Sequence, residues 1–423
     1  MAKSVFGCGA LILLVLATVG TLDAREQIGT FLFLMLVAAL AYLAVLWLIH
    51  TRTAGTSKEL VVCLLLGLAW RVVLLDGVPL VSDDVYRYVW DGRVQQRGLN
   101  PYETIPADPA LASLHTDLTR QIDSTNAALP TIYPPLAQRF FLGVTTVHES
   151  VEAVAIALII ADVLIVVFLW RWLIATQRNR WWVLAYAWHP LVALEGAGGA
   201  HIDVVGTLLL VVAGYALSRR RSLLAVVAFA GAFAVKFLPV VLVPLLWRRV
   251  RLTHALVGLG LVVVLYVPFM QDGALPIGSL ATYAAQWRFN APLFRWMEPV
   301  FGMPALMTLA VVAGLAVAVR ARRTLDRDDP AAWAWPMAVS VGLMPAIYPW
   351  YLVWITPFLT VSTTIPLAVW TLTSIATYAV WAPQLAGIGW VLPEWVEPLE
   401  YGLVAASIVW IWLHRRAAVG PLD

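Results

Sequence analysis

Two adjacent carboxylates, Asp83 and Asp84, open a polar stretch in a very apolar chain, at residues 81–102 (VSDDVYRYVWDGRVQQRGLNPY). A carboxylate at a membrane boundary can act as a general base that takes a proton from a hydroxyl group. Adjacent side chains on a helix point about 100° apart, so we expect only one of the two to face a reacting centre. The alternative is that the pair only starts a helix, where acidic residues are favoured. We take both as candidate catalytic residues.

The residues after this pair have the spacing of a short helix over 83–97, and Gly98 is typical of a helix end. Asp83 and Arg87 are four positions apart, so they can form an ion pair on one face of that helix. The polar side chains beside the two carboxylates are candidate substrate-binding residues. They are Arg87, Tyr88, Asp91 and Arg93.

A second polar group follows a glycine-rich break in the segment 186–205 (YAWHPLVALEGAGGAHIDVV). The glycines interrupt the helix, so His201 and Asp203 fall in the first turn of the next one. Backbone amides at a helix start can bind an anion such as a phosphate, and ionisable residues at a membrane edge are costly to keep. The alternative is close helix packing through small residues. We expect both side chains to bind substrate, whereas one His-x-Asp pair is a weak metal signal.

Lys236, in the sequence FAVKFLPVV, is the only lysine after residue 58. A lysine beside a broken helix can place a point charge on a lipid phosphate; alternatively, its side chain only extends to the membrane surface. We expect it to bind substrate. Three further positions complete the candidate set, although an aromatic belt at the membrane surface also explains the aromatic ones. They are Tyr133, Asn290 and Tyr351.

The composition of the chain restricts its class. Of its 423 residues, 61% are hydrophobic and 13% charged, and the mean hydropathy is +0.82, whereas ordinary soluble domains are about 25% charged. A net charge of +3 is too small to indicate nucleic-acid binding. No P-loop, GxSxG or paired-cysteine motif supports nucleotide-driven chemistry. We therefore expect an all-α polytopic membrane protein that forms one integral membrane domain over residues 1–423.

A membrane span needs about 20 apolar residues, and we expect about twelve to fourteen spans in this chain. The prolines at positions 190, 239, 244 and 357 predict broken or tilted helices that line a cavity. The first apolar segment resembles a signal peptide, but we expect it to be a transmembrane helix because another long span follows. The expected segments are 5–22, 28–49, 59–76, 151–174, 181–195, 201–217, 222–235, 237–247, 253–270, 303–320, 331–346, 351–362, 365–382 and 400–414.

The positions of arginine and lysine orient these segments, because positive charges favour the cytoplasmic side. With a cytoplasmic N-terminus, loops 77–150, 270–302 and 384–399 lie outside. The 77–150 loop then carries the two carboxylates and short interfacial helices at 83–97 and about 136–148. The basic residues expected inside are Arg52, Lys58, Arg178, Arg180, Arg219–Arg221, Arg248, Arg249, Arg251, Arg320, Arg322, Arg323, Arg415 and Arg416.

A resemblance to a known family rests on a series of runs between about residues 70 and 360: SDDVYRYVWDGRVQQRGLNPY, YPPL, WHPLVALEGAGGAHID, AVKFLPVVLVP, YAAQWRFN and YPWYLVWITPF. These runs resemble bacterial GT-C superfamily glycosyltransferases, most closely the polyprenol-phosphate-mannose-dependent mannosyltransferase-like group. Two features depart from that pattern. Trp188-His189-Pro190 stands where Asn-Pro is more usual, and an extra pair of spans precedes the acidic loop.

The resemblance implies a GT-C-type transmembrane helix bundle whose acidic motif lies in the first large extracytoplasmic loop. The motif falls on Asp83 and Asp84, one of which would deprotonate the acceptor hydroxyl. Arg87, Tyr88 and Asp91 belong to the same motif and would position that base. A Gly-x-His-x-Asp pattern of the family matches Gly199, His201 and Asp203.

These features together predict an inverting glycosyltransferase that moves a sugar, with mannose as the family's association, from a polyprenyl-phosphate donor to a lipid or glycan acceptor. We expect it in the bacterial cytoplasmic membrane, with its active site facing the periplasm or exterior. We expect that the reaction requires no cofactor, although a role for a divalent cation is not excluded. We expect no nucleic-acid partner. The alternative is a polytopic transporter or a lipid or glycolipid flippase, whose ionisable residues should lie at the bilayer midplane rather than at one face.

Overall fold

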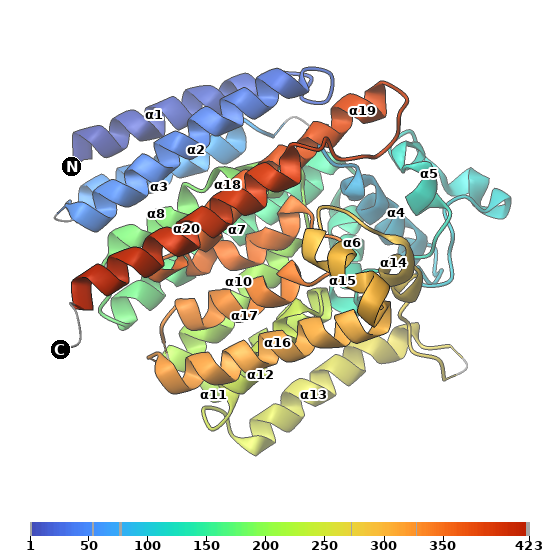
Figure 1. Cartoon of the computed structure of the whole chain (residues 1–423). Coiled ribbons are helices and arrows are strands. Elements are labelled where there is room, and N and C mark those ends of the chain that lie inside the picture. Colours follow the sequence, from blue (N-terminus) through green and yellow to red (C-terminus); the bar gives the residue numbers. More distant parts are fainter. Residues whose placement is uncertain (1, 53–54, 76–77, 272, 327, 420–423) are drawn as a thin grey trace.

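Long apolar helices form the body of the molecule (Figure 1). The computed structural model describes all residues except 1, 53–54, 76–77, 272, 327 and 420–423. The described residues form helices joined by turns and irregular segments, and none of them forms a β-strand. This confirms the all-α class. The longer helices are α1 (Ala2–Val19), α2 (Ile28–Thr51), α3 (Ser57–Val72), α7 (Val151–Ala175), α10 (Asp203–Ser218), α11 (Ser222–Val235), α13 (Leu252–Tyr266), α16 (Met303–Thr324), α17 (Ala331–Gly342), α18 (Ile365–Thr373) and α20 (Val396–Val419).

Six helical segments among the described residues are long and apolar enough to cross a membrane, so the protein is a polytopic membrane protein. They correspond to six of the fourteen expected segments. Three further apolar helices are shorter, at Lys3–Val19, Asp203–Ser218 and Ser222–Val235. The expected number of spans therefore stays a prediction. The six segments are Ile28–Thr51, Val151–Ala175, Leu252–Phe269, Met303–Thr324, Ser362–Leu385 and Val396–Leu413.

The segments that contain Pro190, Pro239, Pro244 and Pro357 are broken into short pieces, as the sequence predicts, because proline removes a helical hydrogen bond and clashes with the preceding turn. Helix α17, in contrast, continues through Pro336. The chain around Pro190 forms η3 (Arg180–Val183), α8 (Leu184–Ala187), α9 (Pro190–Ala193) and the π-helical η4 (Leu194–Gly198). The other short pieces are η5 (Leu238–Leu242), α12 (Val243–Leu246), η6 (Val267–Phe269), α14 (Leu280–Gln286), α15 (Pro292–Phe301), η7 (Pro349–Phe358), η8 (Ser362–Thr364), η9 (Ser374–Val380) and α19 (Trp381–Leu385).

Side chains of neighbouring helices satisfy the backbone groups that the break before Pro190 leaves without helical partners. Tyr42 donates to the carbonyl oxygen of Ala185 at 2.6 Å, and Arg71 donates to that of Ala187. His189 accepts a hydrogen bond from the backbone N–H of Leu191 at 3.2 Å. This is the capping role that an asparagine performs at a helix start, so histidine before Pro190 keeps the local structure.

The loops expected outside gather at one end of the bundle, on the right in Figure 1. The helices that lie together there are α4 (Asp84–Gln96), α5 (Ser124–Ala127), α6 (Pro135–Val147), α14 and α15. The side chain of Trp381 donates to the carbonyl oxygen of Val81 at 3.0 Å, and Ser279 donates to that of Pro130 at 2.7 Å. Loops that are far apart in the sequence therefore join here.

Basic loops gather at the opposite end, where α16 and α20 finish (Figure 1). Arg249 pairs with Asp328, and Arg178 lies 3.6 Å from Asp329. The side chains of Arg415 and Arg416, which the charge pattern also used, lie outside the described residues.

Two helices of the first large loop form a packed pair at the loop end of the bundle. Helix α4 (Asp84–Gln96) ends before Gly98, whose φ of 75° is the left-handed conformation predicted for a helix end. Helix α6 (Pro135–Val147) corresponds to the helix expected at 136–148. At Gly92 a Cβ atom would lie 2.3 Å from Oγ1 of Thr145, so glycine permits the close approach. The loop also contains η1 (Pro109–Leu114), η2 (Thr119–Gln121) and α5 (Ser124–Ala127).

Candidate active site

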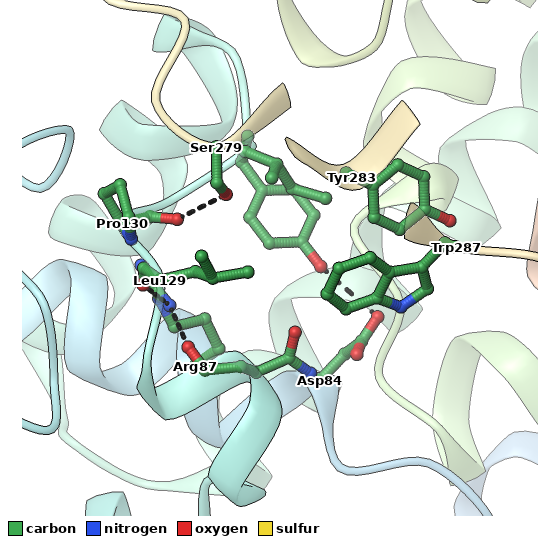
Figure 2. A pocket seen from close by; sticks show the side chains of 10 residues that line it. Asp84, Arg87, Leu129, Pro130, Ser279, Tyr283 and Trp287 are labelled. Atoms are coloured by element: carbon green, nitrogen blue, oxygen red, sulfur yellow. Dashed lines mark hydrogen bonds between the residues drawn. The ribbon is translucent and has the colours of Figure 1, made fainter. Parts of the chain in front are cut away.

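Asp84, the first residue of α4, lines a pocket at the loop end of the bundle (Figure 2). The pocket encloses about 380 Å³ that no protein atom fills, part of it open to solvent. Leu129 and Pro130 lie across it from Tyr283 and Trp287 (Figure 2). Its lining residues are Asp84, Arg87, Asn126, Leu129, Pro130, Ile132, Tyr133, Ser279, Tyr283 and Trp287.

The carboxylate of Asp84 is held by its surroundings near the protonation midpoint at neutral pH. Its Oδ2 accepts a hydrogen bond from the hydroxyl of Tyr133 at 3.2 Å, and 22% of its side chain remains exposed. Dense protein around it raises the pKa of Asp84 to about 7, although the charge of Lys236 and the Tyr133 hydrogen bond act in the opposite direction. A carboxylate with a pKa near the working pH is well suited to accept a proton.

Asp83 points to a different partner. Its Oδ1 accepts a hydrogen bond from Nη2 of Arg25 at 2.6 Å, and its Oδ2 one from Nη1 at 3.3 Å. Arg25 comes from the connection between α1 and α2 and lies over the ring of Trp381, 4.3 Å from its centroid. The predicted ion pair between Asp83 and Arg87 is therefore wrong, because Arg25 reaches Asp83 from another element. Of the two adjacent carboxylates, Asp84 alone lines the pocket.

Arg87 pairs instead with Asp91, one helical turn later, at 2.8 Å. The carboxylate of Asp91 has no exposed surface and also accepts hydrogen bonds from Thr131 at 2.6 Å and from Gln138 at 2.9 Å. These contacts connect the segment just before α6, at Thr131, to α4 and α6. Asp91, predicted to bind substrate, is thus enclosed by protein and has the partners of a structural residue.

The guanidinium of Arg87 also fixes the wall of the pocket. Its Nη1 donates to the carbonyl oxygens of Asn126 at 2.9 Å and Leu129 at 2.8 Å. Its Nη2 is buried and has no hydrogen-bond partner among the described residues. A buried donor without a partner is costly, and Arg87 is one of the residues that line the pocket.

Behind Asp84 lies a fully buried histidine and carboxylate pair. Nδ1 of His201 lies 3.7 Å from Oδ2 of Asp84, and Nε2 lies 3.3 Å from Oε2 of Glu195. Tyr378 donates to the other Glu195 oxygen at 2.8 Å. The ring of His201 stacks on Trp350, with centroids 4.2 Å apart. Both ring nitrogens lack a hydrogen-bond partner among the described residues, which is typical of a functional site.

The sequence analysis missed Glu195, although a glutamate inside the apolar run LVALEGAGGA is a recognisable signal. The π-helical segment Leu194–Gly198 carries it toward His201. A Cβ atom at Gly199 would lie 2.9 Å from Cδ2 of His201 and 3.3 Å from Oε2 of Glu195. The glycine of the Gly-x-His-x-Asp pattern therefore leaves the space that the His201–Glu195 contact occupies.

Lys236 and Asp203 form an ion pair near this cluster, with Nζ 2.7 Å from Oδ1. Trp354 donates to the same oxygen at 2.6 Å. The ammonium group also lies over the ring of Tyr351, 3.8 Å from its centroid, and the hydroxyl of Tyr351 bonds to that of Tyr283 in the pocket wall. The two tyrosines thus connect Lys236 to the pocket, while Asp203 balances part of its charge.

Of the ten predicted substrate-binding residues, Arg87 and Tyr133 line the pocket. Three of the other eight have partners outside the pocket lining. Tyr88 is buried and stacks on Phe141, with centroids 4.4 Å apart. Arg93 binds a carboxylate oxygen of Glu149 at 2.8 Å. Asn290 donates to the buried carboxylate of Glu400 at 3.0 Å. Each side chain has intramolecular partners that hold elements together, and sequence alone does not reveal such partners.

The described residues contain no group of three or more His, Cys, Asp or Glu side chains that could hold a metal ion. The expectation that no cofactor is required stays a prediction.

The fold and the site together define the class of this protein. It is a polytopic helical membrane protein with a carboxylate-lined pocket at one end of its helix bundle. The family model for the N-terminal domain of alpha-(1->6)-mannopyranosyltransferases (MptA/B family) matches residues 3–251, which is more than half of the chain. The protein therefore belongs to this family, which confirms the predicted resemblance to a GT-C-type mannosyltransferase. No curated protein and no solved structure matches the chain.

The matched region includes most of the cluster around the pocket. Asp84, Tyr133, His201 and Lys236 lie inside residues 3–251, whereas Tyr351 lies beyond them. Family membership supports mannosyl transfer as the activity of this protein.

Proposed function

We propose that this protein transfers mannose from a polyprenyl-phosphate donor to a hydroxyl group of a lipid or glycan acceptor, with inversion at the anomeric carbon. The observation that carries the proposal is the position of Asp84. It is an acidic side chain that lines a pocket, has a pKa raised to about 7, and lies beside a buried histidine. Family membership supplies the sugar.

In this mechanism Asp84 is the general base. Its carboxylate takes the proton of the acceptor hydroxyl as the acceptor oxygen forms a bond to C1 of mannose. The bond from C1 to the phosphate oxygen breaks at the same time, and polyprenyl phosphate leaves with the electron pair. Attack from the face opposite the phosphate inverts C1, so an α-linked product requires a β-linked donor.

The leaving phosphate needs positive charge or hydrogen-bond donors beside it. Arg87 supplies a buried Nη2 without a partner at the pocket wall, and guanidinium groups bind phosphate well. Lys236 supplies a second positive charge behind the Tyr351–Tyr283 pair, although Asp203 neutralises part of it. Asp91 likewise balances part of the charge of Arg87, but Arg87 lines the pocket and Lys236 does not, so we assign the closer phosphate contact to Arg87.

The donor and acceptor classes follow from the membrane setting and the family name. A lipid-linked sugar reaches a pocket at the end of a helix bundle from the bilayer, and the chain has no motif for a nucleotide. The family description names an α-(1→6) linkage, so we propose that the accepting group is the C6 hydroxyl of a hexose. This group extends from the sugar ring, which helps it to reach a carboxylate in a narrow pocket.

We place the protein in the bacterial cytoplasmic membrane with the Asp84 pocket facing the periplasm or exterior. The support is the separation of the basic loops from the pocket end of the bundle.

The test is transfer by the purified protein in nanodiscs, supplied with radiolabelled β-linked polyprenyl-phosphate mannose and a membrane glycolipid extract. We expect labelled product that an α-mannosidase specific for 1,6-linkages releases. A matched reaction with nucleotide-linked mannose should give none. Transfer from the nucleotide donor would contradict the proposed donor class, and label moving across sealed vesicles without any covalent product would favour the transporter alternative.

A further inference from the structure

A second hollow lies at the opposite end of the bundle, where α16 finishes and the broken segment after Lys236 leaves the core. It encloses about 970 Å³ that no protein atom fills, part of it open to the surroundings. Two separate stretches of chain form it, one at positions 243–248 and one at 319–323. Its lining residues are Val243, Pro244, Trp247, Arg248, Val319, Arg322 and Arg323.

The three arginines of this hollow differ from the other basic residues at this end. Arg249 pairs with Asp328, and Arg178 lies within ion-pair distance of Asp329. No described carboxylate forms an ion pair with Arg248, Arg322 or Arg323. A hydrogen bond of 3.3 Å from Nη1 of Arg322 to the carbonyl oxygen of Pro244 joins the two walls of the hollow. The hollow thus gathers positive charge that the protein does not neutralise there.

The rest of the wall is apolar and exposed. Trp247 is 64% exposed, Val243 49% and Val319 37%. Val319 belongs to Met303–Thr324, which is long and apolar enough to cross a membrane. A tryptophan at the end of a span prefers the region of the lipid headgroups. Exposed apolar side chains beside unpaired arginines match a molecule with an anionic headgroup and acyl chains.

We propose that this hollow binds an anionic phospholipid of the leaflet opposite the Asp84 pocket. The headgroup phosphate would contact the arginines, and the acyl chains would lie against Val243, Val319 and Trp247. Basic pockets between membrane helices bind anionic lipid headgroups in this way. The proposal does not depend on the reaction at Asp84.

The test measures lipid affinity by native mass spectrometry of the full-length protein in detergent, titrated with phosphatidylglycerol or phosphatidylcholine. Wild-type protein should prefer phosphatidylglycerol. The double variant R322Q/R323Q should lose this preference, by roughly fivefold in affinity for each arginine. R322K/R323K, which keeps the charge, should retain most of it and shows that the fold survives changes at these positions.

The matched control removes the same charge elsewhere. Arg219 and Arg220 are exposed in the turn between α10 and α11, and R219Q/R220Q should bind phosphatidylglycerol as the wild type does. Equal losses in both glutamine variants would overturn the proposal, since the attraction would then come from general surface charge. Equal affinity of the wild type for the two lipids would also overturn it. Full competition by soluble glycerophosphoglycerol at the same concentration would show that the occupant is a soluble anion.

Discussion

Nδ1 of His201 lies 3.7 Å from the carboxylate of Asp84, although the two residues belong to segments that meet only in the folded chain. On its other side His201 faces Glu195. The three side chains therefore form a line from the pocket into the core.

The raised pKa of Asp84 predicts the pH dependence of transfer. Because the carboxylate is the active form, kcat/KM should rise as pH increases through about 7 and then level off. At pH 6 the rate should be roughly one tenth of the plateau, since about nine in ten Asp84 carboxyls are protonated one unit below the pKa. Rates from pH 5 to 9 in nanodiscs test this. A plateau that already begins at pH 5 would contradict the assignment.

The charge of Lys236 offers a second test of the same group. This charge favours the ionised form of Asp84, so Lys236→Gln should move the midpoint of the pH profile upward. Lys236→Arg keeps the charge and is the matched control. A downward shift for the glutamine variant would show that the midpoint belongs to another group.

Glu195→Gln should change the row of side chains behind Asp84, which consists of His201 and residue 195. Glutamine has nearly the same size as glutamate, so the packing should be kept. With glutamate, His201 can direct its Nε2–H toward Glu195, which leaves the Nδ1 atom that faces Asp84 without a hydrogen. A glutamine amide can donate to Nε2 and favour the other tautomer, which puts a hydrogen on Nδ1. We expect kcat to fall about tenfold or more, with KM little changed and the pH midpoint moved downward, because Nδ1–H then stabilises the carboxylate. An unchanged profile with a lower melting temperature would indicate a structural role only.

The contact between Arg25 and Asp83 should affect stability more than chemistry. Both side chains are about three-quarters buried, with 24% and 25% exposure, so Asp83→Asn should cost roughly 1 kcal/mol of unfolding free energy. Thermal unfolding in detergent measures this. Arg25→Gln should lower the melting temperature by a similar amount. A double variant whose loss equals the sum of the two single losses would show that the contact contributes nothing.

Trp287 forms part of the pocket wall and is only partly buried, so it can be replaced without opening the core. We expect Trp287→Ala to raise KM about tenfold while kcat changes little, because a flat aromatic surface binds ground state and transition state alike. Trp287→Phe keeps a ring and should restore most of the affinity. A fall in kcat at constant KM would instead place Trp287 in the transition-state contacts.

Local signals in the sequence predicted the elements of the site well. Helix α4 ends just before Gly98, and helix α6 begins at Pro135, the last residue of the Tyr133-Pro134-Pro135 run, because glycine and proline act within their own turn. The broken segment at Pro190 follows from the same chemistry. The cluster of Asp84, Tyr133, His201 and Lys236 was anticipated as separate candidates and is brought together by the fold.

The partners of these side chains could not be predicted, because they come from distant elements. Arg25 lies 58 residues from Asp83 in the chain and binds it across the bundle end. Glu195 looks like part of an apolar helix until the π-helical turn directs it at His201. Asp203 was expected to face substrate, whereas the folded chain presents it to Lys236. Helix spacing alone favoured Arg87 as the partner of Asp83, and tertiary packing overrode it.

The most direct test of the account compares Asp84→Asn with Asp83→Asn in the transfer of labelled mannose from polyprenyl-phosphate mannose. Both changes remove one carboxylate from the same turn, so they are matched in charge and position. We expect Asp84→Asn to lose about 100-fold to 10,000-fold in kcat, the range for a general base, while Asp83→Asn keeps most of its activity once folded. Full activity of Asp84→Asn, or loss confined to Asp83→Asn in correctly folded protein, would contradict the assignment of Asp84 as the base.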